Sequence, residues 1–484
     1  MSTTVQEPDP AAGSTPQPGA PSAPSAPGKP QFIKINRKIY PRSVKGIFAR
    51  WRWIMFWAIQ TVFYGLCWVP WNGRQAFLCD LTERKFYFFD LVFWPQDVIY
   101  LALLLIISAY GLFLFTAIGG RLFCGYACPQ TLFTEWFLWI EEKIEGPYNV
   151  RQKLDQEPMS ARKLRIKLLK HGVFLLISVW TGFTFVGYFT PIRTLMAEVV
   201  SFTMGPWEIF WVLLYGLATY GNAGFLREQV CLFMCPYARF QSVMFDPDTL
   251  TVTYDKARGE NRGARKKNED YKAAGKGDCV DCNICVQVCP TGIDIRDGLQ
   301  YECIGCSACI DACDQVMDKV GYPRGLIRYS TENALVRHWG AKEISRHLVR
   351  PRTLIYGLIL AVIVAATAWG IATRVPLRVD VIRDRGVMSR ELDDGRIENL
   401  YRLQVINVSE AAHRFSIAVR GAEGVDFEGD HLVEVPPSGT LMVPVVVRIP
   451  AAELAQGKTQ IWFDVARVND AAVAVHEKAT FLKP

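Results

Sequence analysis

Five long segments of the chain consist almost entirely of apolar residues. Each is close to the roughly 20 residues that a helix needs to cross a bilayer. Runs of this length, repeated five times and almost free of charge, favour membrane spans over buried helices of a soluble protein. The first starts too far from the amino terminus, and lacks the cleavage site, to be a signal peptide. The predicted transmembrane helices cover about Trp53–Trp71, Ile99–Ile118, Gly172–Thr190, Ile209–Leu226 and Thr353–Thr373.

Lysine and arginine are distributed unevenly between these helices. Residues 34–52 contain seven of them, whereas the loop between the third and fourth predicted helices contains only Arg193. Because cytoplasmic loops carry the excess of positive charge, the amino terminus and the segment between the fourth and fifth helices are predicted to be cytoplasmic. The tail after Thr373 is then predicted to lie on the outer side of the membrane. The net charge of +7 reflects this topology and not nucleic-acid binding, since no basic stretch alternates with exposed aromatic residues.

The two ends of the chain differ from the helical region. Residues 1–30 are rich in Pro, Ala, Ser and Gly, which predicts a disordered tail. From about Val375 the pattern changes to short alternating stretches separated by turn residues, which predicts an immunoglobulin-like β-sandwich over 375–484. We interpret this cysteine-free region as a docking domain. Its predicted strands are Leu377–Ile382, Leu400–Val408, Arg414–Val419, Leu432–Val435, Thr440–Ile449, Thr459–Val465 and Ala472–Lys478.

Eight of the fourteen cysteines form two similar runs within residues 251–330. Both have the spacing C-x-x-C-x-x-C-x-x-x-C of bacterial two-cluster ferredoxins, in which the fourth cysteine ligates the other cluster. Paired C-x-x-C also suits zinc, but zinc sites use separate knuckles and not this run twice. Disulfides are disfavoured by the tight spacing and by the predicted cytoplasmic location. The predicted [4Fe–4S] ligands are Cys279, Cys282, Cys285 and Cys313 for one cluster, and Cys303, Cys306, Cys309 and Cys289 for the other.

A second cysteine pattern, C-x-x-x-C-P, occurs twice within residues 31–250, each time just after a predicted membrane helix. On a continuous helix a four-residue step would place both sulfurs on one face, and the predicted topology puts all four at the same side of the membrane. Soft thiolates suit Cu(I), and four converging thiolates also suit a further iron–sulfur cluster. Uncoordinated cysteines among lipids are the third interpretation. The residues concerned are Cys124, Cys128, Cys231 and Cys235.

The remaining cysteines, Cys67 and Cys79, lie in and after the first predicted helix. A disulfide between them, or an outward metal site, is possible in principle, but a small hydrophobic role is the better interpretation of Cys67. The chain contains no C-x-x-C-His haem motif, no Gly-x-Gly-x-x-Gly after a strand and no P-loop. No motif therefore predicts that it takes hydride from a nicotinamide, and electrons must come from a soluble donor or a quinol.

The sequence resembles the CcoG/FixG/RdxA family of bacterial cytochrome c oxidase accessory proteins. The matching stretches are WNGRQ at Trp71–Gln75, FWPQD at Phe93–Asp97, both C-x-x-x-C-P pairs and the double ferredoxin run. The resemblance covers residues 31–484 and implies five helices, cytoplasmic clusters and an outer β-domain, with residues 331–374 forming the juxtamembrane segment and the fifth helix. It also implies a role in assembling the cbb-type haem–copper oxidase, by reducing Cu(II) to Cu(I).

Three functional hypotheses follow. The leading one is a membrane cupric reductase in which Cys124, Cys128, Cys231 and Cys235 are the site where copper or an additional redox centre meets the electron path. The second is a quinol-oxidising electron relay, and the third is a non-enzymatic iron–sulfur scaffold or redox sensor. The expected partners are membrane lipid, copper chaperones or oxidase subunits, and a second copy of the chain; no nucleic acid is expected.

Overall fold

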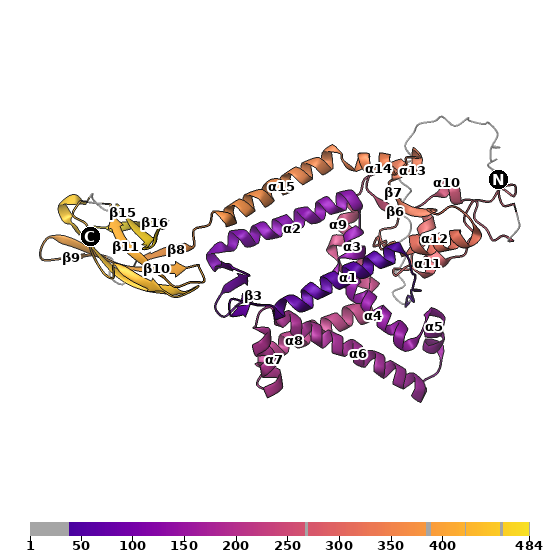
Figure 1. Ribbon diagram of the computed structural model, residues 1–484, viewed down its shortest axis with the longest axis horizontal. Helices are drawn as coiled ribbons and strands as arrows, with labels where there is room; N and C mark the ends of the chain where they lie inside the picture. The colour runs from indigo at the N-terminus through magenta and orange to yellow at the C-terminus, as the bar shows by residue number, and fades with distance from the viewer. Residues whose placement is uncertain (1–37, 267–269, 384–388, 422, 455–457, 484) are drawn as a thin grey trace, which may run out of the picture. The chain divides into compact units, whose positions relative to one another are not determined.

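The computed structural model of the protein describes residues 38–266, 270–383, 389–421, 423–454 and 458–483 (Figure 1). The tail predicted to be disordered, residues 1–30, lies outside the described residues. The chain divides into a short amino-terminal unit, Met1–Ile39, and a large unit, Tyr40–Pro484. All the elements and contacts below belong to the large unit.

Four helices in the described part of the chain are long and apolar enough to cross a membrane: Pro95–Gly119, Ala161–Val186, Pro206–Leu226 and Pro351–Ala372. They match the second to fifth predicted spans. The first predicted span is displaced, because helix α1 covers Ile47–Gly65 and the residues from Pro70 enter a short strand. α1 contains Arg50, Arg52 and the buried Gln60, which reduce its hydropathy. The structure therefore confirms a membrane protein but not the count of five spans.

The long helices pack by close backbone contact. α6 (Ala161–Val186) crosses α8 (Pro206–Thr219) at Gly182, where an added Cβ would lie 2.3 Å from the carbonyl oxygen of Val212. Small residues allow such an approach between membrane helices. α2 (Val98–Gly119) and α15 (Pro351–Ala372) form a second contacting pair and lie side by side (Figure 1). The other helices of this region are α3 (Leu122–Tyr126), α4 (Pro129–Glu145), α5 (Tyr148–Gln156), α7 (Ile192–Ser201), α9 (Pro236–Met244), α13 (Glu332–Val336) and α14 (Ala341–Leu348).

The fourth span ends in two segments of π-helix, η3 (Tyr220–Leu226) and η4 (Val230–Met234), which lead into the second C-x-x-x-C-P pair. π-helical turns are rare and are often found at functional sites. Hydrophobic periodicity alone cannot reveal them, because the apolar composition of the segment is the same in either helix. The sequence therefore located this span without showing how it ends.

The ferredoxin region begins and ends with paired strands. β6 (Thr251–Tyr254) and β7 (Ile327–Ser330) are antiparallel, which brings the two ends of the domain together around α11 (Ile284–Gln287) and α12 (Ala308–Val320). Asp311 of α12 is buried and accepts hydrogen bonds from the backbone amides of Phe48 (3.2 Å) and Ala49 (2.7 Å) in the first turn of α1. A carboxylate at a helix amino terminus satisfies free amides and opposes the helix dipole. This contact fixes α1 to the cluster-binding domain.

The carboxy-terminal domain is a two-sheet β-sandwich, as predicted. One sheet has the strand order β12–β14–β10–β8 with β9 beside β10, and the other has the order β13–β11–β15–β16. Alternate residues of the longer strands, among them Leu403, Phe415 and Val445, are fully buried between the sheets. Each predicted strand overlaps an observed one. The strands are β8 (Leu377–Arg383), β9 (Arg390–Glu391), β10 (Arg396–Asn407), β11 (His413–Arg420), β12 (Asp426–Glu428), β13 (Leu432–Val435), β14 (Thr440–Pro450), β15 (Lys458–Arg467) and β16 (Asp470–Leu482).

The segment between α1 and α2 forms small antiparallel sheets, β1 (Pro70–Trp71) with β2 (Arg74–Gln75), and β3 (Phe77–Asp80) with β4 (Lys85–Phe88) and β5 (Leu91–Phe93). Asp97, at the end of the FWPQD stretch, is buried and forms ion pairs with Arg374 and Arg378. The matched stretches of this segment thus have structural roles at the start of the β-domain.

Candidate iron–sulfur and thiol site

Two small cavities inside the ferredoxin domain are lined by cysteine sulfurs. One is bordered by Cys279, Cys282, Cys285 and Cys313 together with apolar side chains such as Met317 and Ile327. The other is bordered by Cys289, Cys303, Cys306 and Cys309, and Cys285 also reaches it. The structure thus brings the fourth cysteine of each run beside the first three of the other run. Four soft donors in an apolar shell fit a [4Fe–4S] cluster, which when bound supplies one-electron storage.

Both runs have the same backbone geometry around their middle cysteine. Cys282 lies between Asp281 and Asn283, whose φ angles are 53° and 55°. Cys306 lies between Gly305 and Ser307, with φ angles of 67° and 61°. This left-handed region is accessible to glycine and tolerated by Asn and Asp, so the residues flanking each middle cysteine allow the turn. The duplication visible in the cysteine spacing therefore extends to the backbone.

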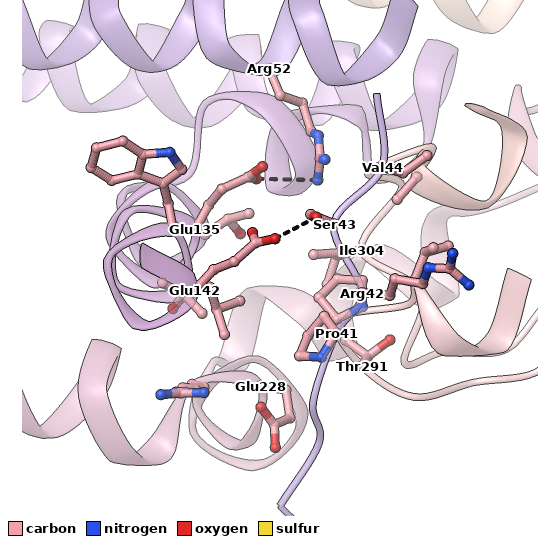
Figure 2. Close-up of a pocket in the computed structure, with 18 of the residues that line it drawn as sticks. Pro41, Arg42, Ser43, Val44, Arg52, Glu135, Glu142, Glu228, Thr291 and Ile304 are labelled. Atoms are coloured by element: carbon pink, nitrogen blue, oxygen red, sulfur yellow. Dashed lines mark hydrogen bonds and ion pairs between the residues drawn. The ribbon is translucent and has the colours of Figure 1, made fainter. Parts of the chain in front are cut away.

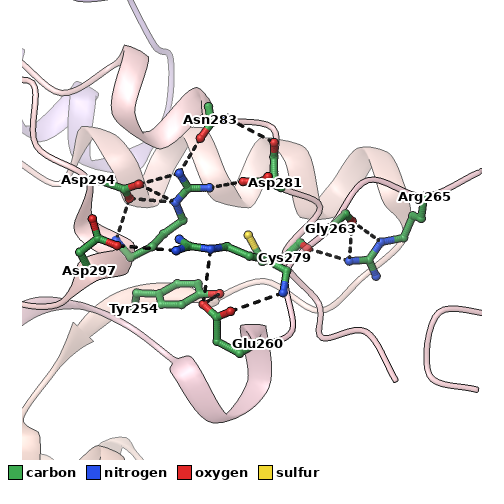
Figure 3. A network of polar contacts seen from close by, with 11 residues as sticks. Tyr254, Glu260, Gly263, Arg265, Cys279, Asp281, Asn283, Asp294 and Asp297 are labelled. Atoms are coloured by element: carbon green, nitrogen blue, oxygen red, sulfur yellow. Dashed lines mark hydrogen bonds and ion pairs between the residues drawn. The ribbon is translucent and has the colours of Figure 1, made fainter. Parts of the chain in front are cut away.

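Side chains from outside the cysteine runs form polar contacts with the turn around Cys282 and with the loop before it (Figure 3). Arg296 is buried and donates hydrogen bonds to the carboxylates of Asp281 and Asp294, each at 2.6 Å. Arg265 donates to the carbonyl oxygens of Gly277 and Cys279, each at 2.7 Å. Arg265 belongs to the charged segment before the runs, so part of this segment packs on the cluster-binding loop. Cys282 itself is exposed, so this corner of the domain is the one nearest to solvent.

The two C-x-x-x-C-P pairs have the same local structure, which differs from the single helix face expected from the spacing. Cys124 lies in α3 and Cys231 in η4, whereas Cys128 and Cys235 precede α4 and α9 with extended backbones (ψ 125° and 111°). In each pair the proline is the first residue of the new helix, where the missing N–H costs nothing. The second cysteine of each pair thus stands at a helix break and not one turn along the same helix.

All four of these thiols gather at one place. Cys231 lies within electrostatic range of Cys128, Cys124 and Cys235. Burial raises the pKa of the Cys124 thiol to about 11 and that of Cys231 to about 12, and the neighbouring sulfurs add to both shifts. Metal ligation requires thiolates, so a bound cation must displace these protons.

The thiol pairs lie directly against the loop of the second cluster cavity. An added Cβ on Gly125 would lie 2.8 Å from the carbonyl oxygen of Gly305 and 2.9 Å from the Cα of Cys306. Arg121, at the start of α3, is buried and donates hydrogen bonds to the carbonyl oxygens of Tyr301 and Cys303. The backbone at Gly125 therefore touches the backbone of the cavity loop, with no side chain between them.

Two glutamines that sequence reasoning did not select connect these pairs. Gln130, two residues after Cys128, donates to the carbonyl oxygens of Asn222 (2.9 Å) and Arg227 (3.1 Å) in the segment before Cys231. Gln241 of α9 is fully buried and accepts a hydrogen bond from the thiol of Cys124 (3.4 Å). Each glutamine therefore joins the two motifs. Gln130 directly follows the proline of the first C-x-x-x-C-P pair, and this position is a signal that could have identified it.

In the described residues, no three His, Cys, Asp or Glu side chains lie close enough together to hold one metal ion. This applies to the ferredoxin cysteines as well as to the C-x-x-x-C-P cysteines. Ligands of a cubane cluster bind four different irons and must stand apart, whereas the ligands of a single copper ion must approach one point.

Cys67 and Cys79 lie apart from this site, and both are free. Cys67 is 1% exposed and packs with Phe183, Val186 and Ile192. Its thiol donates weakly to the carbonyl oxygen of Tyr64 at 3.5 Å. Cys67 therefore acts as a small hydrophobic residue, as the sequence interpretation proposed.

Several known proteins are similar in sequence to this chain. The nitrogen fixation protein FixG of Rhizobium meliloti is 36% identical over 463 residues, covering 87% of this chain and 88% of FixG. The chain belongs to the FixG/RdxA family. RdxB and RdxA of Cereibacter sphaeroides are 37% and 38% identical, over 88% and 82% of this chain and 92% and 86% of their own lengths. A crystal structure of a FixG-related protein from Vibrio parahaemolyticus is 26% identical, covering 22% of this chain and 96% of its own, with a TM-score of 0.20.

Three protein-family models match this FixG/RdxA member. A 4Fe-4S dicluster domain covers residues 226–332, and a 4Fe-4S binding domain covers 101–147. An IG-like fold at the C-terminal of FixG covers 367–484. The chain is thus an iron–sulfur electron-transfer protein of the membrane. The dicluster match includes Cys231 and Cys235 as well as the ferredoxin runs. The match over residues 101–147 lies outside the runs and includes Cys124 and Cys128.

Proposed function

We propose that this protein is a cupric reductase that provides Cu(I) during assembly of a cbb-type haem–copper oxidase. The observation that supports it is the backbone contact between Gly125, inside the first C-x-x-x-C-P pair, and the cluster-binding loop at Gly305 and Cys306. In the proposed reaction, each Cu(II) takes one electron and becomes Cu(I), which thiolates stabilise over Cu(II). We place the protein in the inner membrane, with the ferredoxin domain cytoplasmic and the β-domain periplasmic. Its proposed partners are copper chaperones or oxidase subunits.

The ligands of the two ferredoxin clusters follow from the cavities. We assign Cys279, Cys282, Cys285 and Cys313 to one cluster and Cys303, Cys306, Cys309 and Cys289 to the other, as the sequence predicts. The second lies on the side of the C-x-x-x-C-P thiols, while the first includes the exposed Cys282. In this proposed arrangement the second cluster stands between the first cluster and the thiol pairs.

We further propose that Cys124, Cys128, Cys231 and Cys235 hold a third iron–sulfur cluster, from which Cu(II) is reduced, and not a single copper ion. The match of residues 101–147, which include Cys124 and Cys128, to a 4Fe-4S binding domain supports this choice. Purified protein with all its clusters is expected to contain about twelve irons per chain. Iron and acid-labile sulfide analysis measures this directly. About eight irons, together with stoichiometric copper, would instead assign the four thiols to copper.

Substitution of these thiols tests the reductase. Dithionite-reduced protein is expected to convert Cu(II) to Cu(I), measured with a Cu(I)-specific chelator, and Cys124→Ser and Cys231→Ser are expected to lose this activity. Cys79→Ser is the matched control, since Cys79 lies outside the site. Wild-type rates in both site variants would remove the thiols from the reaction. A wild-type protein whose clusters reduce but show no turnover with Cu(II) would support the scaffold hypothesis instead.

A further inference from the structure

A cavity of about 150 Å³ lies beside the thiol site (Figure 2). Its walls come from the segment before α1, the first turns of α1, one face of α4, the residues between η3 and η4, and the loop of the second cluster cavity. A cavity of this volume accepts a single six-membered ring, as engineered protein cavities of similar size do. The reductase proposal uses Cys231 of its wall but gives no role to the open space itself.

The cavity borders the redox site directly. Cys231 lies in its wall, and so do Pro290, Ile304 and Ala308, which adjoin the cluster ligands Cys289, Cys303 and Cys309 in the chain. A ligand here would therefore be in contact with residues of both centres. Such proximity suits an electron donor or acceptor better than a purely structural ligand.

Polar groups stand at separate sides of the cavity. Figure 2 shows Glu142 and Glu135 projecting from one side, with Glu142 bonded to Ser43, while Glu228 projects from another. Thr131 also lines the cavity, but its hydroxyl is buried and faces away from the open space. The polar groups available to a ligand are therefore the carboxylates of the glutamates.

The remaining wall is aromatic. Trp53 of α1 and Trp139 of α4 make an edge-to-face contact with ring centroids 6.1 Å apart, and both line the cavity. Trp139 contacts Trp53 and is still 43% exposed. Tryptophan is typical of the membrane–water interface. An apolar tail attached to the ring could leave between these side chains toward lipid.

We propose that this cavity binds the one-ring head group of a membrane hydroquinone, which donates electrons to the protein. The proposal rests on the reductase function and supplies its electron source. One hydroquinone becomes one quinone by losing two electrons and two protons. The two oxidised ferredoxin clusters accept one electron each, and the protons pass from the two hydroxyls to the carboxylates of Glu228 and Glu142 and then to water. Two Cu(II) ions are thus reduced for each hydroquinone oxidised.

The charge of the cavity supports a neutral ligand over a metal cation. Four arginines and three glutamates line it, so it carries no negative excess that would attract Cu(II). Arg52 is paired with Glu135 at 3.1 Å, and Arg227 with the buried Glu141 at 2.9 Å. A ring with a hydroxyl at each end matches the apolar middle and the polar sides without adding charge.

Binding of a short-chain quinone to the full protein in detergent tests the site. An azido-substituted ubiquinone is expected to label cavity peptides on illumination, identified by mass spectrometry, and decylubiquinone is expected to compete. Thr134→Phe fills the cavity and should weaken decylubiquinone binding about ten-fold or more. Thr219→Phe is the control, because Thr219 lies in α8 and outside the cavity.

The outcomes separate this site from the reductase proposal. Each variant is first reduced with dithionite, which replaces the hydroquinone as electron donor. Unchanged cluster spectra show that the variant is folded. An unchanged rate of Cu(II) reduction shows that the steps after cluster reduction are intact. Decylubiquinol is then expected to bleach the clusters of the wild type and not those of Thr134→Phe. Labelling outside the cavity, or wild-type binding by Thr134→Phe, overturns the hydroquinone site. Cavity labelling in a protein that never reduces Cu(II) supports the donor site and overturns the reductase.

Discussion

Replacing Gly125 with alanine is expected to slow Cu(II) reduction by on the order of ten- to a hundred-fold, because small misplacements of reacting groups have effects of that size. The iron content of the variant should equal that of the wild type, since Gly125 ligates nothing. The change acts on the relative position of the C-x-x-x-C-P thiols and the second ferredoxin cluster.

The physical reason is a backbone contact that leaves no room for a methyl group. The added Cβ would lie 2.8 Å from the Gly305 carbonyl oxygen and 2.9 Å from the Cys306 Cα and amide nitrogen, whereas ordinary contacts begin at 3.4 Å. The two backbones must therefore separate by about 0.5 Å or more, and overpacking of this kind typically costs about 1–3 kcal/mol. The better helix propensity of alanine returns at most about 1 kcal/mol, so the steric effect dominates.

Gly111→Ala provides the matched control. Gly111 lies in α2, and an added Cβ there meets no atom within 4 Å. Dithionite-reduced wild type, Gly111→Ala and Gly125→Ala are compared for iron content, for the spectrum of the reduced clusters and for Cu(I) production. The first two proteins should be alike, and the third should differ only in Cu(I) production. An unchanged rate in Gly125→Ala would mean that electrons do not pass across this contact.

The grouping of the ferredoxin cysteines follows from their spacing, because each short run can wrap only one corner of a cluster. The spacing predicts that Cys289 and Cys313 lie beside the other run, and the cavities group them in that way. Proline is also favoured in the first turn of a helix, so the helix starts after Cys128 and Cys235 have a local signal. Alternation of apolar residues predicted the β-sandwich because side chains in a strand alternate between its two faces.

Other features depend on contacts between distant residues and leave no local signal. The π-helical turns before Cys231 and the approach of Gly125 to Cys306 are examples. The positive charges around Lys170 are another. The sequence does not show that the buried Lys170 and Arg151 pair with buried carboxylates. Lys170 lies within α6, which continues without a break into the third span.

Replacing Glu141 with glutamine is expected to be among the most destabilising conservative changes in this protein. Glu141 is fully buried in α4 and pairs with Arg227 (2.9 Å), Lys170 (3.4 Å) and Arg151 (3.5 Å). Glutamine keeps the size of the side chain but removes the charge that compensates these cations. Leaving a buried charge without its partner costs about 3–5 kcal/mol, which is a large part of the 5–15 kcal/mol by which proteins are typically stable.

The neighbouring Glu145 cannot replace it. Its carboxylate is also fully buried and already pairs with Lys170 (2.8 Å) and Lys167 (2.7 Å), so Arg227 and Arg151 would lose their carboxylate partner. These two arginines come from the segment before η4 and from α5, and Glu141 thereby holds both segments to α4. Loss of the charge should loosen the connection between α4 and the segment that carries Cys231.

Thermal unfolding in detergent measures the effect. Glu141→Gln should unfold at a clearly lower temperature than the wild type, whereas Glu157→Gln, at an exposed carboxylate after α5, should match it. The double variant Glu141→Gln with Arg227→Gln should recover part of the loss, because it removes one of the uncompensated cations together with the anion. A single variant as stable as the wild type would show that the cations reach solvent. Equal losses in the single and double variants would assign the effect to packing instead of charge.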